Sequence, residues 1–159
     1  MKKALIIFTM LFSLLGISCQ DELKIENNSI YPMGGEWWVK VYQNNTTLSD
    51  YVKIMTYNTA SDDGKIMWID DLDEIWEFKV KCPIDLSSLT FAGQGLQNVT
   101  YNSKVEIANG KILLNAVKAP SKTITDSIYF QAKFSDDKKG LTYTIAGYRK
   151  TGFLEDEHK

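Results

Sequence analysis

The chain has 159 residues, 44% hydrophobic and 24% charged, which is enough for one globular domain with its own core. The formal net charge is −2 and Arg149 is the only arginine, so the sequence has no basic patch typical of nucleic-acid-binding proteins. With three prolines and no low-complexity stretch, disorder is not expected away from the ends.

The first eighteen residues have the pattern of a secretory signal peptide. Lys2 and Lys3 form a positive start, residues 4–15 are apolar, and small residues then lead to Cys19. The apolar run is shorter than the roughly 20 residues of a transmembrane helix. A cysteine at this point resembles the lipobox of bacterial lipoproteins, which implies that Cys19 becomes the lipidated N-terminus. Ordinary signal cleavage at the same place is the alternative.

Residues 19–33 are polar, and we expect them to form a tether between the lipid and the folded domain. The stretch Gln20-Asp21-Glu22, directly after the cysteine, is acidic and resembles the export signal of Bacteroides-type lipoproteins that reach the outer face of the outer membrane. This resemblance implies an outer-membrane lipoprotein of the cell envelope, exposed at the cell surface. A plain solvated linker is the alternative for the acidic residues.

Short segments of alternating polarity, separated by turn residues, predict about eight strands. They cover residues 36–43, 51–59, 65–70, 75–82, 104–108, 111–115, 125–135 and 141–150, and residues 98–101 are a possible further short strand. Residues 84–95 are irregular, and their first part fits a single helical turn or a loop.

Alternation within the strands predicts which side chains face inward. Trp37, which follows a glycine pair, is expected at the closed floor of a barrel. Trp68 is assigned to the inner face of the third strand, and Trp76 and Phe78 to that of the fourth. Pro83 is expected to end the fourth strand, because proline cannot donate to the hydrogen-bonded ladder.

The order of strands and turns predicts the fold. Asn109-Gly110 is a strong hairpin signal between two short strands. No segment has a sustained 3.6-residue apolar period, so the domain is expected to be all-β. Successive hairpins favour an antiparallel up-and-down barrel of about eight strands over a sandwich, because closure removes exposed sheet edges.

Two resemblances point to the same fold. Gly35-Glu36-Trp37 in the first strand, with Arg149 at the end of the last, resembles the calycin signature of lipocalins and fatty-acid-binding proteins. That resemblance implies that the arginine lies over the tryptophan at the closed end of the barrel.

A second resemblance covers nearly the whole mature chain. The segments that carry it are residues 35–39, 55–60, 68–71, 78–81 and 147–153. They resemble the Bacteroides family of lipid-binding putative hydrolases, lipocalin-like barrels that are often lipoproteins. The family commonly has histidine at the position of Tyr148, so a histidine role there is not carried over. The barrel is assigned to residues 34–154 and a tail to 155–159.

Catalytic chemistry has little support in the sequence. There is no Gly-x-Ser-x-Gly motif, and the only histidine, His158, is next to last. Cys82, alone in the mature chain, is expected to be a buried small hydrophobe. The acidic residues 70–74 are interpreted as a solvated turn, with a carboxylate pair or a calcium site as alternatives. We therefore expect a binding protein rather than an enzyme, without cofactor or metal.

Aromatic side chains on the apolar strand faces are the candidate ligand site, with Arg149 or a tyrosine hydroxyl as the polar group that orients the ligand. Whether these rings fill the barrel or line a pocket stays open. The expected function is a membrane-anchored, lipocalin-like protein that binds a small apolar ligand, such as a lipid, inside the barrel. A solid barrel that serves as an interaction module of a cell-surface complex, or a hydrolase, is the alternative. The aromatic candidates are Trp37, Trp68, Trp76, Phe78, Phe130, Phe134 and Tyr143.

Overall fold

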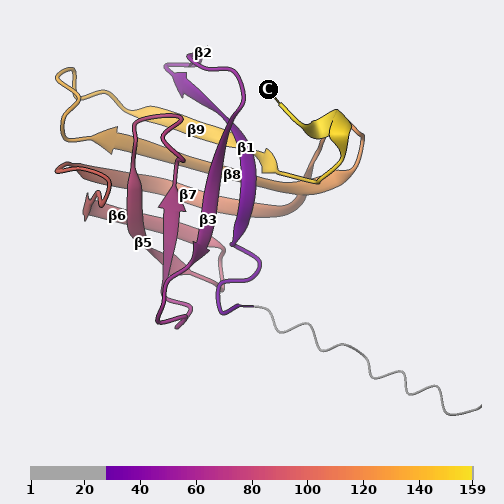
Figure 1. The fold of residues 1–159 in the computed structure, drawn as a ribbon, viewed down its shortest axis with the longest axis horizontal. Helices are drawn as coiled ribbons and strands as arrows, with labels where there is room; N and C mark the ends of the chain where they lie inside the picture. The colour runs from indigo at the N-terminus through magenta and orange to yellow at the C-terminus, as the bar shows by residue number, and fades with distance from the viewer. Residues whose placement is uncertain (1–27, 159) are drawn as a thin grey trace, which may run out of the picture.

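The computed structural model describes residues 28–158, which form a closed antiparallel barrel with a wall of eight strands (Figure 1). Each strand pairs with the next along the chain, and β1 pairs with β9 to close the ring. This confirms the predicted all-β, up-and-down barrel. The strands are β1 (Gly35–Gln43), β2 (Thr46–Thr47), β3 (Val52–Asn58), β4 (Ile66–Asp70), β5 (Lys79–Asp85), β6 (Thr90–Gln97), β7 (Lys104–Lys118), β8 (Ile124–Phe134) and β9 (Tyr143–Arg149).

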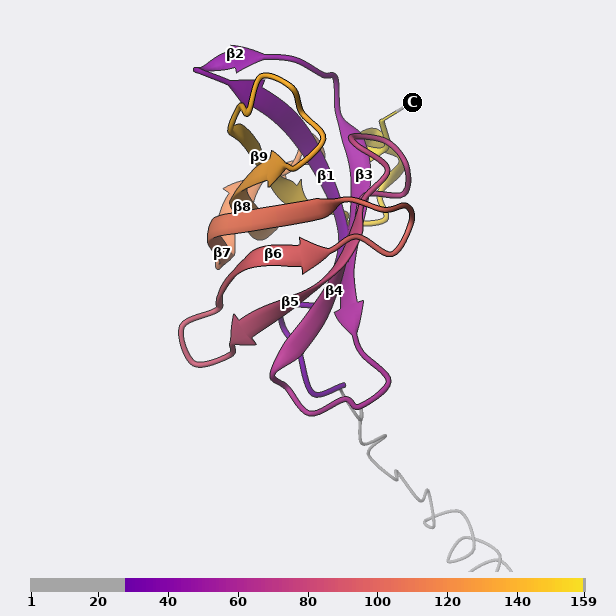
Figure 2. The same ribbon diagram turned by 90° about the vertical axis from the view of Figure 1, so that its left-hand side faces the viewer.

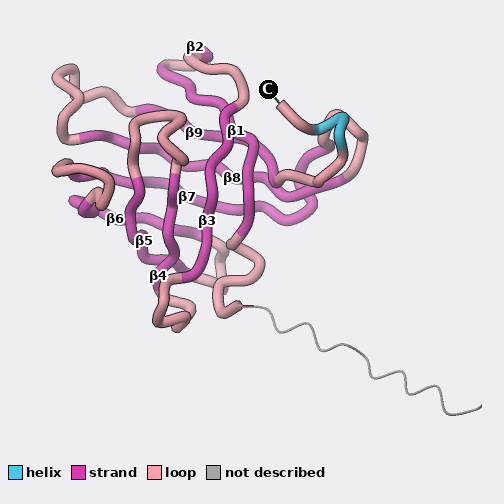
Figure 3. Tube along the Cα trace, viewed as in Figure 1, coloured by secondary structure: helices cyan, strands magenta, loops and turns pink. Residues whose placement is uncertain are grey.

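The wall folds into two layers whose strands cross at a large angle (Figures 1 and 2). β1, β3, β4 and β5 form one layer and β6 to β9 the other, while β2 only extends the β1 hairpin. Figure 3 shows that strands and short loops make up almost all of this region. The exception is the 3₁₀ turn η2 (Leu154–Asp156) near the C-terminus.

The barrel has two different ends, which we call the floor end and the mouth end. By chain order, the floor end carries the start of β1 and the loops 59–65, 86–89 and 119–123. In Figure 1 the described chain begins at the bottom, whereas the C-terminal residues lie at the upper right, beside the β7–β8 hairpin. The mouth end carries the loops 71–78, 98–103 and 135–142 and the β1–β3 connection.

The interior is filled by the inward-facing side chains of all eight wall strands, which form one apolar cluster. Its members are at most 9% exposed, which is the burial expected of a packed core. The largest fully buried side chains are Trp37, Phe78, Phe130, Ile30, Met33, Ile54, Met67, Ile69, Ile107, Ile112, Ile128 and Ile145.

The predicted turn at Asn109-Gly110 is wrong, because β7 runs through it as one long strand. The pairing of β7 with β8 shifts register between Ala108 and Lys111, so the two residues form a bulge. Asn109 has φ 53°, the left-handed geometry that makes Asn-Gly a turn signal. A Cβ on Gly110 would lie 2.4 Å from the carbonyl oxygen of Phe91, so glycine permits the close approach of β6.

The predicted bounds of the fourth strand are also wrong. β5 starts at Lys79 rather than residue 75 and continues through Pro83, which pairs with Ile66. The Ile84 amide donates to Lys65, on the β4 side, so the nitrogen of Pro83 faces β6. The β5–β6 ladder includes only Ile84 and Asp85, so Pro83 removes no bond from it. The possible strand at residues 98–101 is a loop.

Candidate functional site

Trp37 forms the floor of the barrel, as predicted. Its side chain is fully buried, and its Nε1 donates to Thr56 Oγ1 at 2.8 Å. Thr56 in turn donates to the Met33 carbonyl at 2.6 Å, which fixes the segment leading into β1. Arg149 Cζ lies 4.3 Å from the centroid of the Trp37 ring, so the cation–π contact implied by the calycin resemblance is present.

The Arg149 guanidinium is bonded on all three nitrogens. Nε lies 2.9 Å from Asp126 Oδ2, and the two terminal nitrogens donate to the carbonyls of Gly34 and Pro32. A Cβ on Gly35 would lie 2.1 Å from Nη1, which explains the glycine in the signature. Arg149 therefore ties the last strand to the entry of the first. It is not the free polar group that the sequence predicted.

The loop 71–78 folds over the mouth, and one carboxylate sets its shape. Asp71 is 1% exposed and accepts four backbone N–H bonds, from Asp73 (3.1 Å), Ile75 (3.2 Å), Trp76 (2.7 Å) and Phe78 (2.8 Å). Burial raises the pKa of Asp71, while these four bonds act in the opposite direction. Asp71 is thus a buried structural group, so the prediction of a solvated turn is wrong for this residue.

The mouth loop places Trp76 over the aromatic end of the core. The Trp76 ring is stacked on Phe134 with centroids 4.6 Å apart and planes 2° apart, and Tyr143 lies 5.5 Å from Trp76. Phe78, the last residue of the loop, lies 5.4 Å from Phe134. Four predicted site residues therefore meet at the mouth, although Trp76 and Phe78 come from a loop and not from a strand. Phe130 lies elsewhere in the core, 5.7 Å from Phe91.

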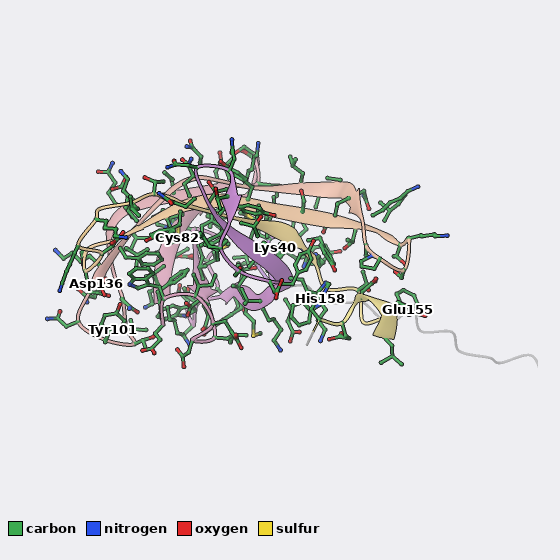
Figure 4. All side chains as sticks on the ribbon, turned by 90° about the horizontal axis from the view of Figure 1, so that it is seen from above. Lys40, Cys82, Tyr101, Asp136, Glu155 and His158 are labelled. Carbon is green, nitrogen blue, oxygen red and sulfur yellow. The ribbon has the colours of Figure 1, made fainter. Side chains whose placement is uncertain are left out.

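Asp136, on the β8–β9 loop, holds the mouth loop in place. Trp76 Nε1 lies 3.3 Å from each Asp136 oxygen, and the Tyr101 hydroxyl donates to the same carboxylate at 2.8 Å. The Tyr101 bond is the main cause that lowers the pKa of Asp136. Figure 4 shows Tyr101 and Asp136 together at one end of the molecule, far from Glu155. Three loops are thus joined across the mouth through one exposed carboxylate.

Trp68 lies on the outer face of the barrel, so its predicted interior position is wrong. Its neighbours in β4, Met67 and Ile69, are fully buried and face inward. The Trp68 ring has Lys79 Nζ at 5.4 Å and Lys81 Nζ at 5.1 Å from its centroid. The two lysines cover apolar surface that would otherwise face water.

Cys82 is buried inside the barrel, as predicted. Burial raises the pKa of its thiol to about 12, so the thiolate is absent at neutral pH. Its Sγ lies 3.6 Å from the carbonyl of Pro83. The thiol is therefore a small core side chain and not a nucleophile.

The C-terminal residues form an aromatic cluster that the sequence analysis missed. His158 stacks on Tyr51 with centroids 4.1 Å apart, meets Trp38 edge-on, and its Nε2 lies 2.6 Å from the Tyr148 hydroxyl. Burial lowers the pKa of His158 and raises that of Tyr148 to about 12. No local pattern in the sequence predicts that a tail residue returns to β1 and β9.

An open cleft of about 780 Å³ lies on the outer side of β5 to β8. It lies where β5 and β6 pair over only two residues. Phe91 lines the cleft and also contacts Phe130 of the core. The lining residues are Pro83, Ile84, Asp85, Thr90, Phe91, Ala92, Asn109, Gly110, Lys111 and Tyr129.

Two further features of residues 28–158 bear on function. No group of three or more His, Cys, Asp or Glu side chains there is arranged to hold a metal ion. No helix in this part of the chain is long and apolar enough to cross a membrane. Cys19 and the predicted signal peptide lie outside the described residues.

A family model described as lipid-binding putative hydrolase matches residues 22–154 of the chain. The match covers the tether region in part and every strand of the barrel. No curated protein matches the chain.

Proposed function

Because this chain belongs to the lipid-binding putative hydrolase family, we propose that it binds one small apolar molecule, such as a lipid chain, inside its barrel. The observation that carries the proposal is the aromatic closure of the mouth. Trp76 covers an interior lined almost entirely by apolar side chains, and it belongs to a loop rather than to the wall. Such a loop can move without breaking the strand ladder.

Binding requires two changes from the closed structure. The mouth loop must lift Trp76 from Phe134, which costs an aromatic contact of about 0.5–1.5 kcal/mol. Core side chains must then repack, because they fill the interior. An apolar ligand offsets these costs at about 25 cal/mol per Å² of surface removed from water. Under this proposal the closed structure exchanges with an open one in which Trp76 has lifted, and a ligand that binds the open form shifts this equilibrium.

We also propose that the protein is held on the outer membrane by a lipid on Cys19. The supporting observation is geometric: the described chain begins at Asn28 on the floor end, opposite the mouth. An anchor on this side directs the mouth away from the bilayer. Exposure at the cell surface is part of the same proposal.

The filled interior favours a second candidate function, a solid barrel that acts only through its outer surface. Hydrolysis is not proposed. His158 bonds Tyr148 rather than a serine or cysteine, and the Cys82 thiol is held protonated.

Native mass spectrometry of the protein purified from its own membrane tests the leading proposal, together with titration of a fluorescent fatty acid. We expect a co-purified apolar molecule or saturable probe binding. Trp76→Ala should speed probe entry, whereas Trp68→Ala, on the outer face, should leave it unchanged. Absence of both a co-purified ligand and probe binding would favour the solid barrel.

A further inference from the structure

The floor end exposes an unusual number of large apolar side chains. Most of them lie on the β7–β8 hairpin or on the segment just after β9. Scattered exposed apolar residues are common, but a group at one end of a protein marks an interaction surface. The five are Leu113 (49% exposed), Leu114 (47%), Ile124 (57%), Phe153 (51%) and Leu154 (88%).

The structure holds these side chains in place. Asp156 is fully buried and accepts bonds from the Ser121 amide and hydroxyl, both at 2.6 Å. The Thr151 hydroxyl also donates to Asp156. Phe153 and Leu154 are therefore fixed beside the tip of the β7–β8 hairpin, which projects past the barrel (Figure 1).

The charged side chains at this end fit an interface between water and lipid. Lys118 and Lys122 are exposed at the hairpin tip, and in the described part of the chain neither has a carboxylate within 4 Å. Glu155 is also exposed there, so the surface is weakly rather than strongly basic. Lysines beside apolar side chains can keep their charge among headgroups while their stems contact acyl chains.

The start of the described chain is linked to the base of this hairpin, although it lies below the hairpin tip in Figure 1. Arg149 bonds both Asp126, at the base of the hairpin, and the Pro32 carbonyl near the start. Asn28 comes nine positions after Cys19 in the sequence. Fully extended, this stretch reaches about 30 Å, so a lipidated Cys19 keeps the floor end near the bilayer.

We propose that the floor end is a membrane-contacting surface, on which the β7–β8 hairpin and residues 153–154 insert their apolar side chains into the headgroup region of a phospholipid bilayer. The proposal rests on the proposed lipid anchor. The anchor and this surface act as two attachments, and together they fix the orientation of the barrel.

A site-specific probe tests this in the full-length lipidated protein. Leu154→Cys carries an environment-sensitive fluorophore, and Val99→Cys, 55% exposed at the mouth end, is the matched control. Cys82 is buried and does not compete for the label. Both variants are reconstituted in phosphatidylcholine and phosphatidylglycerol vesicles that contain a quencher in the upper acyl chain.

We expect quenching to be at least about twofold stronger at residue 154 than at residue 99. Replacing both Phe153 and Leu154 by serine should remove this contact. A fluorophore on Ile124→Cys should then be quenched less, while the protein stays on the vesicles. Equal quenching at both sites, or none, would overturn the proposal. So would protection of residue 154 in native membranes but not in pure lipid, because a protein would then be the partner.

The same samples separate this proposal from those on which it depends. Mass spectrometry of the N-terminal peptide reports acylation of Cys19 directly, and fatty-acid titration reports ligand binding. If Cys19 is not acylated, the anchor proposal fails and the membrane surface fails with it. If acylation and quenching are found without ligand binding, only the interior-binding proposal fails.

Discussion

Replacing Asp71 by asparagine should open the mouth loop. The asparagine side chain has one oxygen that accepts hydrogen bonds and one nitrogen that only donates them. One pair of backbone N–H donors therefore loses its acceptor, whichever way the side-chain amide is oriented. The lost pair is either Asp73 and Phe78, on Oδ1, or Ile75 and Trp76, on Oδ2. The amide nitrogen would also point its own hydrogens at those donors.

The size of the effect follows from the charge and the burial of this carboxylate. A hydrogen bond to a charged group contributes about 1.5–3 kcal/mol, so two lost bonds cost about 3–6 kcal/mol. Burying the ionised carboxylate also costs free energy, which is why the pKa of Asp71 is raised, and asparagine avoids that cost. We expect a net loss of about 3 kcal/mol in the free energy of unfolding.

Urea unfolding measures this loss, and hydrogen exchange locates it. The amides of Trp76 and Phe78 should exchange faster in Asp71→Asn, while those of β8 and β9 keep their protection. Asp73→Asn, two residues away on the exposed side of the same loop, is the control and should change stability by less than about 0.5 kcal/mol. Equal stability of the two variants would refute the assignment of Asp71 as the group that holds the loop.

Three further predictions concern the floor, the core and the tail. Arg149→Lys should lower the free energy of unfolding by about 2–3 kcal/mol, because lysine cannot bond Asp126 and two carbonyls in the same geometry; a change below 0.5 kcal/mol in urea unfolding would contradict this. Cys82, in protein lacking Cys19, should resist Ellman's reagent until denaturant is added, and rapid reaction in buffer would show that the core is open. His158 has its pKa lowered from 6.5, so its contribution to stability should be complete above pH 6.5 and decline as the pH falls through the lower folded-state value. The urea midpoint of the wild type should therefore fall between pH 7.5 and pH 5. The midpoint of His158→Gln should not show this part of the fall, and an equal fall in both proteins would contradict the prediction.

The arrangement of the floor was predicted from the resemblance of Gly35, Trp37 and Arg149 to the calycin signature, and the guanidinium does lie over the indole. The inner position of Trp37 followed from alternation along the first strand. The core position of Cys82 followed from simple alternation with Val80. Such regularities are local, and local patterns are what a single sequence shows.

The errors arose where local signals were ambiguous or incomplete. In β4 both faces are apolar, and only the lysines of the next strand make the outer position of Trp68 favourable. Asn109-Gly110 requires positive φ, which a bulge satisfies as well as a turn. The role of Asp71 depends on a loop that curls around it. The docking of His158 depends on contacts between distant segments, which no periodicity reports.

The pairing of β1 with β9 also constrains how the molecule is made. Trp37 finds its partner, Arg149, only after almost the whole chain has been synthesised. Contacts between residues so distant in sequence form slowly, because a long loop must close first. Until then the nascent polypeptide has no complete ring and presents unpaired strands at both edges. The lipid anchor proposed above requires the chain to cross a membrane before it folds, and late closure is compatible with that order, since the last segment needed for the ring is also the last to be made.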